Sequence, residues 1–153
     1  MRSFGKWIFV GFLIILVSAC QPRKPEYDIA SAVQQDNAKE LSQYLAEGGD
    51  PNKESRFGDP LLYLATGRQG GEDVTRLLLN AGADVNAVGR NGIHALVSAA
   101  SWCNIEEIKL LLNAGADVNI KSKKNKTALN SVCKTPKNRR AQTIELLISA
   151  GAE

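Results

Sequence analysis

The chain is poor in the residues that most often build catalytic and metal sites. His94 is the only histidine among 153 residues, which excludes a histidine cluster for a metal ion. Glu106 and Glu107 are adjacent, and on a helix their side chains would point about 100° apart, so they do not face each other as an acid–base pair. We expect both glutamates on a charged solvent-exposed face, and His94 in a structural role with a ring nitrogen bonded to loop backbone. We predict neither enzymatic activity nor a cofactor or metal ion.

Long apolar runs are also scarce. One occurs at Ile8–Val17, interrupted by Gly11, and it follows a basic start that contains Arg2 and Lys6. The run is too short for a membrane-spanning helix, which needs roughly 20 apolar residues. A basic start, a short apolar run and the small residues Ser18 and Ala19 together predict a secretory signal.

The end of this signal, Val17-Ser18-Ala19-Cys20, resembles the lipobox of bacterial lipoproteins. The resemblance implies cleavage before Cys20, with lipid on its thiol and on its new amine, and more than one acyl chain makes a stable anchor. Gln21 differs from the aspartate that commonly retains such proteins at the inner membrane. We therefore expect a signal peptide at 1–19, a lipidated tether at 20–26 and an outer-membrane anchor facing the periplasm of a Gram-negative bacterium. Simple secretion is the alternative.

Acidic residues are scarce near the C-terminal end. Val118–Glu153 has eight basic and two acidic residues, whereas Glu26–Asp73 has ten acidic and four basic ones. Three explanations stay open: solubility alone, electrostatic steering of a partner protein with an acidic patch, or contact with anionic lipid A head groups. Nucleic acid is not expected, because the basic run lacks stacking aromatics and the predicted address is extracytoplasmic.

Ten identical residues, LLLNAGADVN, occur at Leu77–Asn86 and again 33 residues later at Leu110–Asn119. A related stretch, Gly48–Asn52, precedes the first copy, and Gly151-Ala152 follows the second. A fixed period of this length predicts supersecondary units that stack and share a core, because one unit cannot bury its apolar face alone.

The period and these residues resemble the ankyrin repeat over residues 27–153. The resemblance implies an all-α solenoid of about four stacked helix–turn–helix units, at about 27–54, 55–88, 89–121 and 122–153. Gly58 and Gly92 match the turn glycine of the family, and Asn125 replaces it in the fourth unit. The threonine–proline–leucine–histidine motif of the family is poorly kept, so we expect less regular turns than in consensus repeats.

The repeat also predicts which side of each helix is buried and where the helices end. Leucine pairs such as Leu78-Leu79 and Leu111-Leu112 should bury a helical stripe. Gly82 and Gly115 should end helices in a left-handed cap, and Asp and Asn near the turns should bond local backbone. We expect the first helix of the fourth unit to include Cys133 and a second helix at Ala141–Ala150 to close the stack.

Cys103 and Cys133 are the two thiols left once Cys20 is lipidated. An oxidising compartment favours a bridge between them. Against it, helices about 10 Å apart do not easily provide the roughly 5.5 Å Cα spacing of a disulfide. A disulfide and two buried thiols both stay open.

In ankyrin proteins, partners bind the concave face made by the turn tips and the first helices. By resemblance, the candidate contacts comprise the three tips and two aromatic residues: Lys53, Arg56 and Phe57; Val88 and Arg90; Lys121, Lys123 and Lys124; and Tyr63 and Trp102. Aromatic residues and arginine often dominate binding energy. For Trp102, packing against the linker to the second helix is an equal alternative.

With a lipid anchor, a rigid binding surface and no catalytic chemistry, the predicted protein resembles the periplasmic ankyrin lipoproteins that act as immunity proteins. These cap a toxic secreted enzyme such as a lipase or a wall hydrolase. The sequence therefore suggests a monomeric envelope protein that binds and inhibits another protein. The alternative is a non-inhibitory periplasmic adaptor or scaffold.

Overall fold

The computed structural model describes residues 28–67 and 71–153. The predicted signal peptide, the predicted lipobox and the predicted lipid-attachment residue Cys20 lie outside these residues. The described elements are α1 (Ile29–Gln34), α2 (Ala38–Ala46), α3 (Leu61–Ala65), α4 (Glu72–Asn80), η1 (Arg90–Gly92), α5 (Ala95–Trp102), α6 (Ile105–Asn113), η2 (Leu129–Ser131) and α7 (Lys137–Ser149), where η denotes a 3₁₀ turn. No helix in this part of the chain is long and apolar enough to span a membrane.

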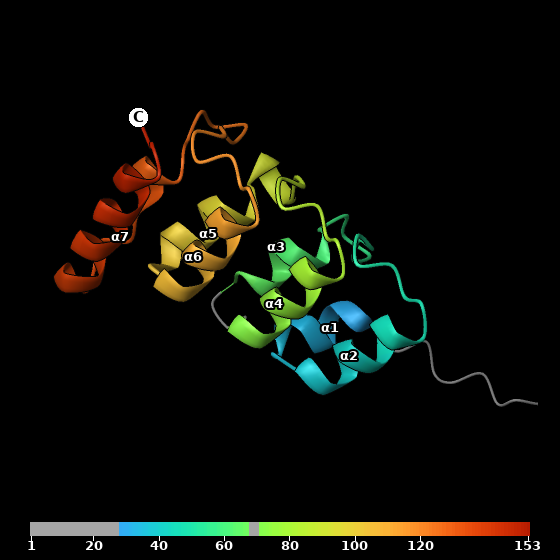
Figure 1. Cartoon of the computed structure of the whole chain (residues 1–153). Coiled ribbons are helices and arrows are strands. Elements are labelled where there is room, and N and C mark those ends of the chain that lie inside the picture. The colour runs from blue at the N-terminus through green and yellow to red at the C-terminus, as the bar shows by residue number, and fades with distance from the viewer. Residues whose placement is uncertain (1–27, 68–70) are drawn as a thin grey trace, which may run out of the picture.

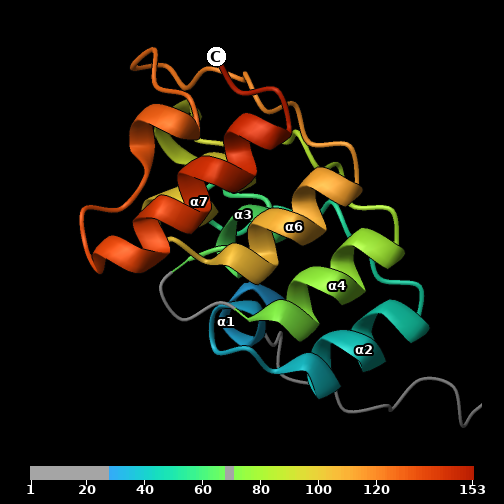
Figure 2. The same cartoon turned by 60° about the vertical axis from the view of Figure 1, so that its left-hand side comes forward.

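The helices form two layers of a single stack, as the all-α solenoid prediction requires. The second helices of the units, α2, α4, α6 and α7, pack in chain order, and Figure 2 shows them side by side along one face. The first helices, α1, α3 and α5, and the turn η2 form the other layer in the same order. The loops between units project along one edge of the stack (Figure 1).

The core lies between these two layers and follows the repeat. Leu78, Leu111 and Leu147 each precede a helix-ending glycine by four residues, and all three are fully buried. Ala65 and Ala99 in the first-helix layer are also fully buried, and their small side chains let neighbouring helices approach closely. The predicted leucine stripe is confirmed for Leu78 and Leu111, whereas Leu79 and Leu112 are partly buried and pack against the core.

The predicted glycine caps are confirmed as well. Gly82 and Gly115 both have φ +87°, a left-handed conformation that favours glycine. After α4, the Gly82 N–H donates to the Leu79 carbonyl and the Ala83 N–H to the Leu78 carbonyl. This pair of bonds satisfies two carbonyls at the helix end that would otherwise have no intrahelical partner.

The asparagines of the repeat do more than bond local backbone. Asn52 Oδ1 accepts from the Asp84 N–H at 2.7 Å, and Asn86 Oδ1 accepts from the Asp117 N–H at 2.9 Å. Asn119 completes the series by accepting from the Glu153 N–H at 2.9 Å. Each asparagine therefore joins its unit to the next one. The expected local role belongs to the aspartates two residues earlier: Asp84 Oδ1, for example, accepts from the Asn86 N–H at 2.9 Å.

The fourth unit departs from the prediction in both of its helices. Its first helix is reduced to η2, and the backbone is extended from Val132, so Cys133 does not lie in a helix. The closing helix begins at Lys137 rather than Ala141, because the basic residues 137–140 supply its first turn. Pro136 precedes this helix. Proline has no backbone N–H, and at this position the helix does not need one.

The prediction that Glu107 faces solvent is wrong. Glu106 is exposed and pairs with Lys109 at 2.9 Å, but Glu107 is fully buried at the repeat position that Val74 fills in α4. Neither carboxyl oxygen of Glu107 has a hydrogen bond of normal geometry in the described part of the chain. Burial raises the pKa of Glu107 to about 8, with a smaller contribution from the negative charge of Asp36 and an opposing one from Asn104.

Loss of the bond between Asn86 and the Asp117 N–H should weaken the junction of the second and third units. We expect Asn86→Ala to lower the free energy of unfolding by roughly 0.5–1.5 kcal/mol in urea titrations. Asn113→Ala, at the exposed end of α6, is the control and should be neutral or slightly stabilising, since alanine favours helix. Equal effects of the two substitutions would contradict a role for Asn86 between units.

Glu107 should make stability depend on pH. Its pKa in the folded chain lies above the ordinary value of 4.5. The stability that the neutral, buried carboxyl allows is therefore fully present below about pH 4.5 and is lost as the pH rises through about 8. Because glutamine does not ionise, Glu107→Gln should reduce this loss of stability. At pH 9 its free energy of unfolding should exceed that of the wild type by roughly 1–3 kcal/mol. The free energy of unfolding measured from pH 5 to 9 tests this, with Glu106→Gln as the exposed neighbouring control. A wild-type profile that stays level over this range would refute it.

Candidate protein-binding surface

Three turn tips share one backbone design. Ser55 N–H donates to the Asp59 carbonyl, Gly89 N–H to that of Ile93, and Ser122 N–H to that of Lys126, all at 2.8–2.9 Å. Gly58, Gly92 and Asn125 occupy one matching position with positive φ, as predicted for the turn glycine and its replacement. The closing bond and this positive-φ position are the same in all three turns, but the second turn also has Asn91 at φ +58° within η1. The expected irregularity is therefore present in the second turn, and the helices that follow the turns also differ in length.

Phe57 is the most exposed apolar side chain at the tips. It is 65% exposed, and the guanidinium groups of Arg56 and Arg90 lie 4.6 and 5.3 Å from the centre of its ring. Val88, at the start of the second tip, is 53% exposed. Two exposed apolar side chains on neighbouring rigid turns, flanked by arginines, have the composition of residues that dominate protein interfaces.

Asp59 and Arg90 hold the first two tips together. Asp59 is buried, and its two oxygens accept from the backbone N–H of Arg90 at 2.9 Å and from its guanidinium at 2.7 Å. The guanidinium remains about half exposed. Arg90 therefore supports Phe57 and is still available to a partner.

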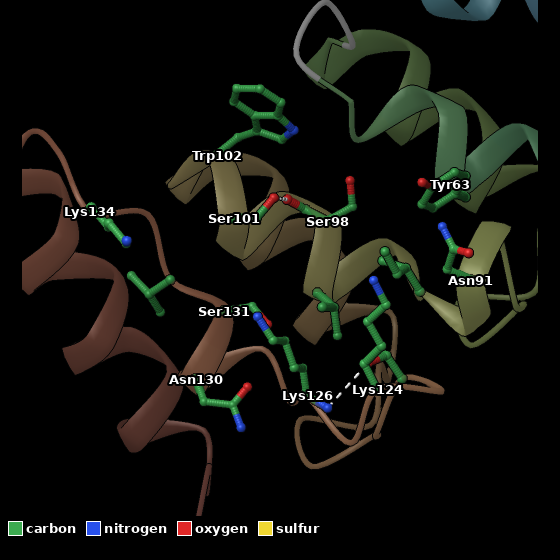
Figure 3. A pocket seen from close by; sticks show the side chains of 14 residues that line it. Tyr63, Asn91, Ser98, Ser101, Trp102, Lys124, Lys126, Asn130, Ser131 and Lys134 are labelled. Atoms are coloured by element: carbon green, nitrogen blue, oxygen red, sulfur yellow. Dashed lines mark hydrogen bonds between the residues drawn. The ribbon is translucent and has the colours of Figure 1, made fainter.

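A cavity of about 440 Å³ opens between the second tip, α5 and the fourth unit (Figure 3). Its lining includes Tyr63, Trp102 and three lysines: Lys124 of the third tip, Lys126 and Lys134. Figure 3 shows Trp102 and Tyr63 on different sides of the cavity, with Lys124 and Lys126 lower in that view than both rings. The cavity therefore brings together side chains from the second, third and fourth units.

Tyr63 connects this cavity to the second tip. An added Cβ at Gly89 would come within 2.5 Å of the Tyr63 ring, so the ring packs directly on the glycine backbone. Burial, with the nearby negative charge of Asp59, raises the pKa of Tyr63, and Arg90 opposes the shift. The phenol stays neutral, and its ring has a fixed position at the wall of the cavity.

Cys103 and Cys133 are joined by a disulfide with a Cα–Cα distance of 5.6 Å. Of the two alternatives that the sequence left open, the structure contains the bridge. Stacked regular helices would have held the Cα atoms too far apart, but Cys103 is a left-handed residue that ends α5 and Cys133 lies in extended chain. The Cys133 N–H also donates to the Ala100 carbonyl at 3.2 Å. Both links fix the segment that carries Val132 and Lys134 at the cavity.

The structure separates the predicted contact residues into two groups. Tyr63, Trp102 and Lys124 line the cavity, whereas the others lie at the tips outside it: Lys53, Arg56, Phe57, Val88, Arg90, Lys121 and Lys123. Sequence reasoning missed Lys126 and Lys134. Lys126 matches Ile93 of the second tip in the turn pattern, so aligning the tips could have found it. Lys134 lies in the irregular segment between η2 and α7, and it has no equivalent residue in the other units that could have identified it.

His94 is structural, as predicted. Its Nδ1 lies 3.0 Å from the Asn86 carbonyl oxygen, so the ring bonds the loop that leads to the second tip. Among residues 28–67 and 71–153 no three side chains of His, Cys, Asp or Glu form a group suited to a metal ion.

Comparison with known proteins agrees with the repeat geometry. A family model of ankyrin repeats in three copies matches residues 29–122 and 69–153, which together cover the whole stack. The chain belongs to the ankyrin-repeat family, and such repeats imply binding to another protein. A mitochondrial disaggregase of Bos taurus is 37% identical over 84 residues, which make up 55% of this chain and 12% of that protein. The chain thus spans a small part of the length of that relative.

Proposed function

We propose that this protein is a non-enzymatic envelope lipoprotein that binds and inhibits a toxic secreted enzyme. Binding uses the three tips and the cavity beside them. The observation that carries the proposal is the exposed pair Phe57 and Val88, held on neighbouring turns that the Asp59–Arg90 ion pair locks together. A preorganised apolar contact with arginines around it loses little entropy on binding.

The cellular address in this proposal rests on two observations. Residues 17–20 have the lipobox pattern. The Cys103–Cys133 disulfide supports an oxidising compartment, because such bridges form and persist outside the reducing cytosol. In this arrangement the lipid holds the stack at the membrane, and the stack meets the enzyme in the periplasm.

Inhibition should depend on the apolar tips. We expect affinity purification of the lipidated protein from envelopes to recover a secreted hydrolase, and Phe57→Ser with Val88→Ser to weaken its affinity roughly 10-fold or more. Periplasmic co-production should protect cells from that hydrolase, and the double variant should not. Ile148→Ser, which alters an equally exposed apolar side chain on α7, is the control. Recovery of an envelope assembly without any protection would instead identify an adaptor.

Anchoring should depend on Cys20. Wild-type protein should incorporate labelled palmitate and fractionate with the outer membrane. Cys20→Ser should remove the label. A wild-type chain that stays unlabelled and retains Met1 in the cytosol would contradict the envelope location.

A further inference from the structure

The cavity between the second tip, α5 and the fourth unit is cationic without any compensating acid. Among its lining residues are Lys124, Lys126 and Lys134, and none is an aspartate or a glutamate. The ion pairs of the described residues involve other cations, so these three amines have no partner within that part of the chain. The three amines give the lining a net positive charge, which an anion inside the cavity would offset.

The hydroxyl groups of the cavity are largely occupied by the protein itself. Ser98 Oγ donates to the Thr66 carbonyl at 3.0 Å, Ser101 Oγ donates to the Ser98 carbonyl at 2.7 Å, and Ser122 Oγ accepts from the Lys126 N–H at 3.2 Å. The Ser131 hydroxyl is buried without a hydrogen-bond partner among the described residues, and the amides of Asn91 and Asn130 can both donate and accept. The three lysine amines can only donate and carry the only formal charges of the lining, so its charge favours a carboxylate over a cation.

The lining also has apolar side chains, which favour a ligand whose carboxylate lies next to an apolar group. Ile93, Val97 and Val132 contribute aliphatic surface, and Tyr63 and Trp102 contribute aromatic rings. A volume of about 440 Å³ is within the usual range for binding pockets and holds a few side chains, though not a helix. A protruding loop with acidic residues next to an aliphatic one fits both parts of the lining.

The position of the cavity favours a loop of the partner protein over a lipid head group. Tyr63 packs on Gly89, so the cavity is continuous with the second tip, where Val88 and Arg90 lie. A partner seated on the tips would therefore extend over the cavity opening. The wall that carries Val132 and Lys134 is held by the adjacent disulfide, so the site is preorganised.

We infer that this cavity receives an acidic loop of the partner protein, with carboxylates bound by Lys124, Lys126 and Lys134 and a neighbouring aliphatic side chain packed against Val97 and Val132. This inference rests on the proposed function, because it specifies the part of the bound protein that enters the site.

The test uses the full chain and two fluorescein-labelled peptides, Gly-Ser-Leu-Asp-Glu-Asp-Leu-Gly-Ser and its twin with Asn-Gln-Asn in the centre. Fluorescence anisotropy should show the acidic peptide binding at least about 10-fold more tightly than the amide twin, with an affinity that falls as salt rises. Lys124→Glu with Lys126→Glu should weaken the acidic peptide at least about 10-fold. The matched control, Lys39→Glu with Lys137→Glu, changes the net charge equally at exposed positions outside the cavity and the tips, and should cost less than about 3-fold.

A second measurement shows whether the peptide binds in the cavity. Quenching or a shift of Trp102 fluorescence, obtained by subtracting the signal of Trp102→Phe protein, should accompany binding of the acidic peptide. Equal weakening in the two lysine variants, no tighter binding than the amide twin, or an unchanged Trp102 signal would overturn the inference. So would binding to phosphatidylglycerol vesicles that the Lys124 and Lys126 substitutions abolish while the peptide does not bind. In these cases the proposed function still stands if partner capture continues to require Phe57 and Val88.

Discussion

The stack depends on one hydrogen bond repeated between successive units. The asparagine that ends Gly48–Asn52 and each of the two Gly-Ala-Asp-Val-Asn stretches accepts from a backbone N–H of the following unit, at Asp84, Asp117 and Glu153. The buried leucines attract neighbouring units without specifying an angle, because hydrophobic burial has no direction. A hydrogen bond has strict geometry, so it sets how one unit meets the next. The identical decapeptide is conserved within the chain for this reason: its leucines supply the core, its glycine ends the helix, and its asparagine positions the neighbour.

The features that the sequence predicted well are those that depend on the period. The four units, the buried Leu78 and Leu111, the caps at Gly82 and Gly115 and the turn position of Asn125 all follow from comparing equivalent residues. The failures occur where one unit carries a residue that its equivalents do not. Glu107 fills the position of Val74, and the period alone cannot reveal that an acid has been buried there. The fourth unit keeps only η2 of its first helix, because the backbone leaves helical geometry at Val132 and Pro136 disfavours helical geometry at the residue before it.

The binding surface was only partly accessible to sequence reasoning, for a related reason. Turn positions identify which side chains are exposed at the tips, so Phe57, Val88 and Arg90 were found. A cavity is defined by three-dimensional neighbours from separate units, and Lys134 reaches it through an irregular segment fixed by Cys133. The charge asymmetry along the sequence did indicate that the basic residues would gather in the last units. Their orientation around Tyr63 and Trp102 required the structure.

The bond between units has a consequence for how such a chain can change. In these bonds each asparagine oxygen contacts the main chain of the next unit, and every residue except proline has a main-chain N–H. Glu153 accordingly takes the same place as Asp84 and Asp117. A unit can therefore be duplicated, deleted or exchanged with this bond between units intact. Exposed tip side chains that take no part in the bond, such as Phe57 and Val88, can then change without altering how the asparagines join the units.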